Sequence, residues 1–396
     1  MSEAVVTRRS DRRESESFST RVLRETLARY GARFGLAWIA VVALAAVFAP
    51  FLANSHPIAM KVDGAWQSPL LTHLTWIDLA LLAAFAAAVG AWLLRRRLSG
   101  PRRLAMVALV TVVAAGTSYL TLSPPMAVIF DQYRSGLADG SIESAIFAPV
   151  PFSPTDRSRD NPLSLTPPDA LHLMGTDEDG ADVLSRMIHA CRIALGIGFV
   201  ATGIALAIGI LYGGIMGFFT GWVEILMMRF LEIFESIPQL FLLLTVVAFF
   251  GRNIYLIMAV IGLTSWPGYA RYLRAEFLKL RRQDFVQAAE ACGLPIWSIL
   301  FRHMLPNGVA PLLVGASFGI ASAILAEAVL SFLGLGVVDE PSWGGMLNQA
   351  VGPGGTFAVW LATYPGLAIF LTVFAYNLIG EALRDAIDPH LQRQPS

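Results

Sequence analysis

The sequence predicts an all-α, polytopic membrane protein with about eight transmembrane helices. Of its 396 residues, 55% are hydrophobic and only 15% are charged, a balance typical of membrane proteins and unlike that of soluble enzymes of similar length. Apolar runs of about 20 residues recur along the chain, and only helices or closed barrels can span a lipid bilayer. Because these runs are far too long for barrel strands, we expect helices. The formal net charge of +0 gives no indication of nucleic-acid binding.

Residues 1–35 are polar and rich in arginine, and the first apolar run, residues 36–53, follows them. A cleaved signal peptide would have a shorter charged region and a small-residue cleavage site, which the end of this run lacks. Arginines collect on the cytoplasmic side of membranes. We therefore expect a cytoplasmic tail followed by a retained transmembrane helix.

Residues 54–122 contain a second and a third span, at 77–94 and 104–122. The turn between them is basic, which places it in the cytoplasm by the positive-inside rule. Its arginines are Arg95, Arg96, Arg97, Arg102 and Arg103. Residues 123–192 then lie outside the cytoplasm, and their many Pro, Ser and Asp residues predict an extended, irregular, periplasmic segment.

A region of five more spans follows within residues 193–389. The expected spans are residues 193–220, 225–251, 253–276, 309–334 and 357–383. In the second of these, Arg229 and Glu232 are three residues apart and are expected to pair, and Pro238 is expected to bend the helix. A basic cluster after the third places residues 283–307 in the cytoplasm. Both chain termini are then cytoplasmic, and the free cysteines Cys191 and Cys292 fall on opposite sides of the membrane and do not pair.

The polar stretch 283–307 predicts two short helices joined by a tight corner. Asp284 and Gln287 form a capping-box pattern, so that a helix can start at Phe285. Gly293 suits the position just after that helix. Pro295 suits the first turn of a second helix, which Pro306 is expected to close. An ordinary loop between two spans is the alternative interpretation.

This stretch resembles the cytoplasmic EAA loop of binding-protein-dependent ABC importer permeases. The spacing of the motif is intact, with Gln287 in place of the usual Glu and His303 at a usually aliphatic position. The matching residues are Gln287, Ala288, Ala289, Gly293, His303, Leu305 and Pro306. The resemblance implies that the helix from Phe285 to Cys292 docks on a separate cytoplasmic ATPase.

Residues 172–186 are similar to a signature of the C-type subunits of dipeptide, oligopeptide and nickel permeases. The matching residues include Gly175, Thr176, Asp177, Gly180 and Asp182, and Ala181 stands where Arg is usual. The aspartates and His172 lack the spacing of a calcium loop and include a single His, so we expect no metal site. We expect Thr176 and the aspartates to cap the following helix and to contact a binding protein.

The resemblance covers residues 172–389 strongly and does not cover residues 58–168. Members of this family usually have six spans, so the hairpin 77–94 and 104–122 is an insertion, and its even number of spans leaves the downstream orientation unchanged. Glu327 lies within an expected span, where acids are costly and often functional. For Glu327, contact with substrate and structural pairing are both open.

The resemblance implies a type I ABC importer permease fold in the C-terminal half and a translocation-pore subunit of the bacterial inner membrane. Its substrates would be di- or oligopeptides, or nickel or similar small solutes. Its partners would be a homologous B-type permease, two ATP-binding cassette ATPases and an extracytoplasmic substrate-binding protein. The chain has no phosphate-binding loop, so ATP and Mg²⁺ would belong to the ATPases, and we expect no enzymatic activity and no cofactor here. A secondary carrier, or a channel or scaffold protein without ATPase partners, is the alternative.

Overall fold

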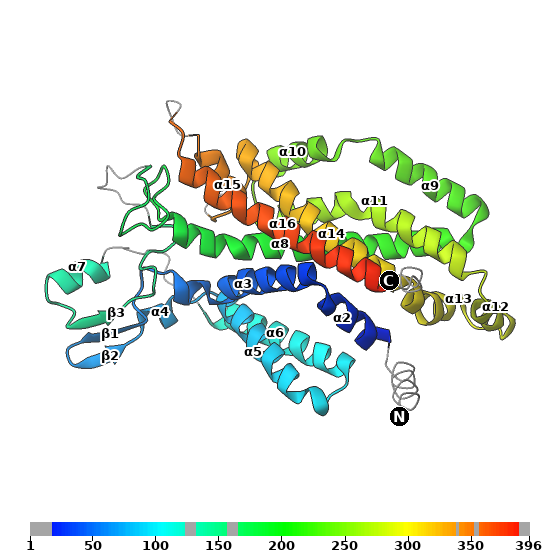
Figure 1. Cartoon of the computed structure of the whole chain (residues 1–396), viewed down its shortest axis with the longest axis horizontal. Helices are drawn as coiled ribbons and strands as arrows, with labels where there is room; N and C mark the ends of the chain where they lie inside the picture. Colours follow the sequence, from blue (N-terminus) through cyan, green and yellow to red (C-terminus); the bar gives the residue numbers. More distant parts are fainter. Residues whose placement is uncertain (1–17, 123–131, 157–164, 338–339, 352–355, 388–396) are drawn as a thin grey trace, which may run out of the picture. The chain divides into compact units, whose positions relative to one another are not determined.

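The computed structural model describes residues 18–122, 132–156, 165–337, 340–351 and 356–387, and these residues are mainly helical (Figure 1). The chain divides into two compact units. The core unit comprises Met1–Ala40, Leu195–Gly336 and Leu367–Ser396, and the insert unit comprises Val41–Ala194 and Val337–Gly366.

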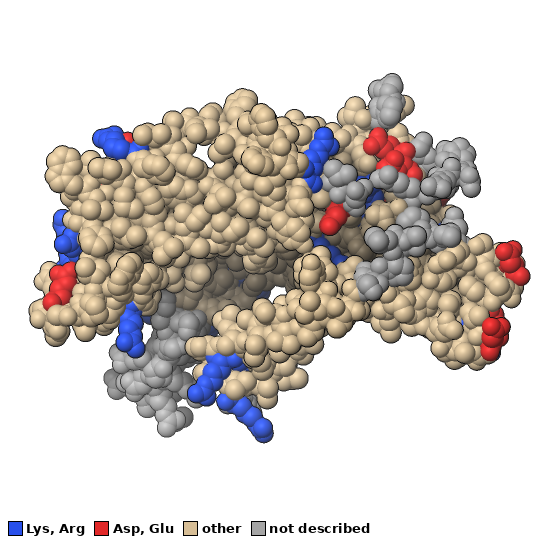
Figure 2. Space-filling model, turned by 180° about the vertical axis from the view of Figure 1, so that it is seen from behind, with Lys and Arg blue, Asp and Glu red and all other residues tan. Residues whose placement is uncertain are grey.

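Among the described residues, six helical segments are long and apolar enough to cross a membrane, or seven if one bent pair counts as a span. The six are α3 (Tyr30–Leu52), α5 (Trp76–Leu93), α6 (Gly100–Thr121), α8 (Val183–Phe219), the Pro311–Leu335 segment and α16 (Val359–Ile387). Few Lys, Arg, Asp or Glu side chains lie on the face of the molecule shown in Figure 2. The chain is therefore a multi-pass membrane protein, as its composition predicts.

The bent pair consists of α9 (Gly221–Glu235) and α10 (Gln239–Phe250), which meet at 70°. Pro238 immediately precedes α10, which confirms the predicted bend. The predicted pair is also present, with Arg229 Nη1 lying 2.6 Å from Glu232 Oε2. An eighth expected span corresponds to α11 (Ile254–Leu280), whose 27 residues include several charges near the C-terminal end. It is long enough to cross a membrane but is less apolar than the other segments.

In the core unit, α8 and α11 approach closely through glycines. A Cβ atom added at Gly217 would lie 2.7 Å from Cβ of Phe277, and one at Gly213 would overlap the backbone of Ala270. Helix α9 is attached to α11 by two ion pairs, Glu224 with Arg274 and Glu235 with Arg271. No hydrophobic driving force holds helices together in lipid, so the close packing at the glycines of α8 stabilises its contact with α11.

Residues 296–333 form one continuous run of helix, and Gly334, with φ of +79°, interrupts it near its C-terminal end. Helix α13 (Ile296–Ser298) continues through a π-helical turn, η2 (Ile299–Met304), into α14 (Leu305–Leu330) and η3 (Ser331–Leu335). The expectation that Pro306 ends the second short helix is therefore wrong. Pro306 lies in the first turn of α14, where a missing N–H is tolerated, and the wide π-helical turn precedes it.

Helices also occupy part of the expected polar tail. Helix α2 (Phe18–Ala28) and the start of α3 lie within residues 18–35. Arg29, in the short link between them, pairs with Asp385 of α16 at 2.5 Å, and Trp38 Nε1 donates to Thr372 Oγ1 at 3.0 Å. These contacts attach the N-terminal helices to α16 within the core unit.

The insert unit contains a small antiparallel sheet that the all-α prediction missed. Its strands are β1 (Ala59–Val62), β2 (Ala65–Gln67) and β3 (Ser144–Ile146), in the order β2-β1-β3. Asp63 and Gly64 join β1 to β2 with φ of 49° and 76°, the backbone of a tight hairpin turn. Short helices α4 (Pro69–Thr72), α7 (Gln132–Ala138) and α15 (Trp343–Gln349) complete this unit, with η1 (Leu94–Arg96) between α5 and α6.

Candidate functional site

The N-terminus of the first short helix differs from the prediction. Helix α12 (Asp284–Ala291) begins one residue earlier than expected, so that Gln283 is its N-cap. Gln287 is then one position beyond the place that a capping box requires. In the described part of the chain, no side-chain hydrogen bond caps this helix, and Gln287 Nε2 lies 3.5 Å from the carbonyl oxygen of Arg282. The predicted capping box is therefore wrong, although Asp284 still places a negative charge at the positive end of the helix dipole.

The C-terminus of α12 is as predicted. Gly293 has φ of +72°, a left-handed conformation that glycine adopts without strain. Its N–H donates to the backbone carbonyl oxygen of Glu290 at 2.9 Å, and the N–H of Leu294 donates to the carbonyl oxygen of Ala289 at 3.2 Å. This pair of bonds is a Schellman motif, which ends the helix and turns the chain sharply into α13.

One face of the stretch 283–307 is buried within the core unit. Val286 and Ala289 of α12 pack with Leu300 and Met304 of η2 and with Phe277 of α11. Because these side chains come from α11, α12 and η2, α12 packs against the helices on either side of it.

The other face of the stretch exposes apolar side chains. Trp297 is 63% exposed, and its ring stacks on that of Phe301 with centroids 5.8 Å apart. Phe285, Leu294 and Ile296 are also exposed, and Ala288 lies on the exposed side of α12. We call these six residues the apolar face. Several exposed apolar side chains in one polar segment are typical of a protein-binding site. The motif did not indicate the two aromatic residues, although their spacing of four places them on one side of a helix.

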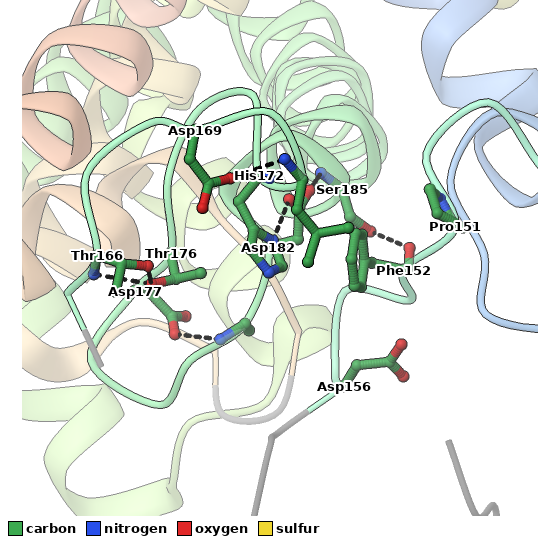
Figure 3. A network of polar contacts seen from close by, with 12 residues as sticks. Pro151, Phe152, Asp156, Thr166, Asp169, His172, Thr176, Asp177, Asp182 and Ser185 are labelled. Carbon is green, nitrogen blue, oxygen red and sulfur yellow. Dashed lines mark hydrogen bonds and ion pairs between the residues drawn. The ribbon is translucent and has the colours of Figure 1, made fainter. Parts of the chain in front are cut away.

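The signature segment forms a polar network in the insert unit, in which Asp177 and Asp182 are buried (Figure 3). Asp182 is buried, and its Oδ1 accepts the N–H of Ser185 at 2.7 Å, which caps α8. Its Oδ2 lies 2.9 Å from Nδ1 of the buried His172. Asp182 thus caps α8, as expected. The helix begins at Val183, ten residues before the predicted start at 193.

Asp177 organises the turn before this helix. Its Oδ1 accepts the N–H groups of Asp179 and Ala181, at 2.9 and 2.8 Å, and its Oδ2 pairs with Arg186. Gly180 has φ of +78°, which permits the turn. Arg186 therefore supplies a cation to this carboxylate in a segment where Ala181 replaces the usual arginine.

Gly175 and Thr176 hold the segment against α16. Trp360 Nε1 donates to the carbonyl oxygen of Thr176 at 2.9 Å. A Cβ atom at Gly175, where φ is +78°, would lie 2.9 Å from the same indole ring and 2.7 Å from the carbonyl oxygen of Thr166. The glycine is thus required both by its backbone conformation and by the close approach of the indole.

Asp169, just before this segment, also binds backbone groups. The backbone N–H groups of His172 and Leu171 donate to Asp169 Oδ1, and the first of these bonds chiefly holds the pKa of Asp169 below its usual value. No group of three or more metal-ligating side chains is present among the described residues. The geometry therefore serves backbone organisation, and it gives no positive indication of a metal.

Glu327 is 3% exposed and accepts a hydrogen bond from Ser331 Oγ at 2.6 Å within α14 and η3. This hydrogen bond is a contact within the protein, and the choice between substrate contact and structural pairing stays a prediction. A separate cavity of about 1290 Å³ lies in the core unit, and Glu327 is not among the residues that line it.

The described residues thus form a multi-pass helical membrane protein with exposed apolar side chains on the stretch between two of its helices. The family model described as "Binding-protein-dependent transport system inner membrane component" matches residues 209–393. The chain is 40% identical over 246 residues to the oligopeptide transport system permease protein OppC of Haemophilus influenzae, covering 61% of this chain and 78% of that protein. It is also 40% identical over 257 residues to the di/tripeptide transport system permease protein DppC of Pseudomonas aeruginosa, with 63% and 84% covered.

The chain belongs to the family of binding-protein-dependent transport system inner membrane components. Among solved structures, it is similar to an inward-facing form of the MetNI methionine ABC transporter, with 19% identity, a TM-score of 0.42, and 52% of this chain and 98% of that chain covered. As a permease of an ABC importer it is not itself an enzyme, and ATP hydrolysis belongs to separate subunits.

Proposed function

We propose that this chain is one of two permease subunits that form the pore of an ATP-driven importer of di- and oligopeptides in a bacterial inner membrane. The peptide assignment is supported by the names of relatives that are 40% identical to it. The observation that carries the coupling assignment is the apolar face of residues 285–301 on a base buried within the core unit.

In this proposal α12 docks in a groove of a cytoplasmic ATP-binding cassette subunit. The small side chain of Ala288 allows close approach, and the aromatic pair of Trp297 and Phe301 widens the contact. Movement of the ATPase is transmitted through the buried contacts of Val286 and Ala289 to α11 and α14. In this proposal the contact couples transport to ATP hydrolysis only if α12 and the ATPase bind each other with different free energies in the two nucleotide states.

The full assembly would contain a homologous B-type permease, two ATPases that bind ATP and Mg²⁺, and an extracytoplasmic binding protein. The basic turn between residues 94 and 104 supports cytoplasmic chain termini and an extracytoplasmic position for the signature segment. There, residues 172–186 would contact the binding protein, while their internal hydrogen bonds fix the start of α8.

The test is uptake by the native host with the chromosomal gene deleted and then restored. We expect the deletion to abolish uptake of radiolabelled Ala-Lys-Ala, and the wild-type gene to restore it. Uptake should stop on ATP depletion and continue when an uncoupler collapses the proton gradient. Loss of ⁶³Ni uptake with unchanged tripeptide uptake would replace peptide by nickel as the substrate, and dependence on the proton gradient alone would indicate a secondary carrier.

A further inference from the structure

The cavity of the core unit is a groove formed by helices expected to lie in the membrane. Its volume is about 1290 Å³, and α8, α10, α11 and α14 line it. Its lining includes four charged side chains, Glu235, Glu276, Lys279 and Arg384. It also includes uncharged polar side chains, among them Thr202, Gln239, Thr264, Ser265, Tyr269 and Ser322. Such groups are unfavourable against lipid tails and are usually directed toward protein or water.

Two of these groups have hydrogen-bonding capacity to spare. Thr202 is 5% exposed, and its Oγ1 has no hydrogen-bond partner among the residues that the structure describes. Tyr269 Oη makes a long contact of 3.4 Å with the carbonyl oxygen of Gly315. A buried hydroxyl without a partner costs about 1–3 kcal/mol, so water or a polar solute in the groove would stabilise this arrangement.

Gln239, the first residue of α10, is held in a defined orientation at the bend between α9 and α10. Its Nε2 donates to Thr264 Oγ1 at 3.1 Å and to Ser265 Oγ at 3.0 Å. Both hydroxyls donate to the carbonyl oxygen of Ile261, at 3.0 and 2.7 Å, so they are left to accept from the amide. This pattern fixes which end of the amide is the nitrogen.

The carbonyl end of the side chain is consequently available. Within the described residues, Gln239 Oε1 accepts no hydrogen bond, and the side chain is exposed. Glu235, one turn earlier in the chain, is bound to Arg271. The groove therefore presents at this bend an uncharged acceptor in a fixed position, which suits an N–H donor of a solute.

We propose that Gln239 contacts the solute during translocation, with Oε1 accepting an N–H group of a peptide backbone or terminus. This inference rests on the proposed function, because it takes the peptide as the solute that passes the groove. Thr264 and Ser265 are positioning residues for the amide. A neutral acceptor binds peptides of either side-chain charge, whereas a charged side chain at 239 would select between them.

A cysteine-labelling experiment tests whether the groove is filled by water or by lipid. Gln239→Cys is compared with Thr245→Cys on the same helix, in a background of Cys191→Ala and Cys292→Ser whose abundance in the membrane equals that of the wild type. Thr245 is exposed, does not line the groove, and donates to Phe241 of its own helix at 2.7 Å. We expect a charged, membrane-impermeant maleimide to modify Gln239→Cys and to spare Thr245→Cys. Equal labelling of both, or none at position 239, would overturn the inference.

A selectivity experiment tests contact with the solute itself. In the native host, initial uptake of Ala-Lys-Ala and Ala-Glu-Ala is measured for the wild type, Gln239→Glu and Gln239→Lys. Two unit charges ~4 Å apart in water change an equilibrium by about fivefold, so we expect Gln239→Glu to raise the ratio of Lys to Glu peptide uptake by about that factor or more. Gln239→Lys should lower the ratio.

A residue with a purely structural role would lower the uptake of both peptides equally. An unchanged ratio in both charged variants, with normal wild-type uptake, would therefore overturn the role of Gln239 and leave the proposed function intact. Absence of tripeptide uptake in the wild type would instead overturn the proposed function.

Discussion

Asp78 and Arg192 form a buried ion pair that joins the inserted hairpin to α8, with Nη1 and Oδ1 2.5 Å apart. Arg192 Nε also donates to the carbonyl oxygen of Ala46 in α3 at 2.6 Å. Oδ2 of the carboxylate accepts from the backbone and the hydroxyl of Thr75, both at 2.7 Å, within the capping box of α5. One guanidinium thus connects α3, α5 and α8, so the insertion is an integral part of the insert unit.

Removal of one member of this pair should destabilise the insert unit strongly. We expect Asp78→Ala to lower the free energy of unfolding by about 3 kcal/mol, because it leaves a partly buried guanidinium without its counter-ion. The double variant Asp78→Leu/Arg192→Met should lose much less. Thermal unfolding of the detergent-solubilised protein measures both, and Thr75→Ala, which removes only the cap hydroxyl at about 1 kcal/mol, is the matched control. A single variant as stable as the wild type would show that the pair is not formed.

The sequence predicts those features that depend on neighbouring residues. The apolar runs all become helices, because a segment of about 20 residues in lipid must satisfy its backbone hydrogen bonds internally. Pro238 and Gly293 act through their own backbone geometry, so their bend and helix stop could be located without knowledge of the fold. The pair of Arg229 and Glu232 likewise depends only on helical spacing.

Features that depend on distant partners could not be derived in this way. Asp78 and Arg192 are 114 residues apart, and no local pattern connects them. The capping-box prediction failed because the helix began one residue early, which moved Gln287 past the required position. Pro306 was misjudged because a π-helical turn before it accommodates the ring. The small sheet had one local signal, the Asp63-Gly64 turn, but its strands have only three or four residues each.

The left-handed backbone at Gly293 provides a prediction about the corner after α12. No atom lies within 4 Å of a Cβ placed at this position, so a substitution changes the backbone energy and not the packing. We expect Gly293→Val to destabilise the corner by about 1–2 kcal/mol or more, and Gly293→Asn, which tolerates this conformation, by less. Hydrogen exchange at the amides of residues 293 and 294 measures the effect. Equal protection in the two variants would contradict it.

His56 should make the insert unit sensitive to acid. The side chain is 6% exposed, and its ring centroid lies 3.9 Å from that of His73. Burial, with a smaller contribution from His73, lowers the pKa of His56 from 6.5 to about 4. Between these pH values the unfolded chain binds a proton that the folded chain does not, so stability falls as the pH decreases, by at most ~1.4 kcal/mol per pH unit.

The melting temperature in detergent should accordingly be lower at pH 4.5 than at pH 7. His56→Gln removes this titration and should flatten the dependence, whereas His303→Gln in the core unit should preserve it. If the slope were the same with and without the His56 imidazole, another group would be responsible for the acid sensitivity.

The docking of α12 on an ATPase is the central claim, and the structure shows which alanine tests it. Ala289 is buried against Leu300, so a glutamate there would disturb folding. Ala288 lies on the exposed side of the same helix, and Ala275 is another exposed alanine, in α11 and outside the apolar face. Ala288→Glu and Ala275→Glu therefore add the same charge, one at the proposed contact and one away from it.

The most direct measurement is the initial rate of Ala-Lys-Ala uptake in the native host, normalised to the amount of each variant in the membrane. We expect Ala288→Glu to reduce this rate by at least about tenfold, corresponding to a loss of ~1.4 kcal/mol in docking free energy, and Ala275→Glu to retain the wild-type rate. Uptake at the wild-type rate by Ala288→Glu, at equal abundance in the membrane, would contradict coupling through α12.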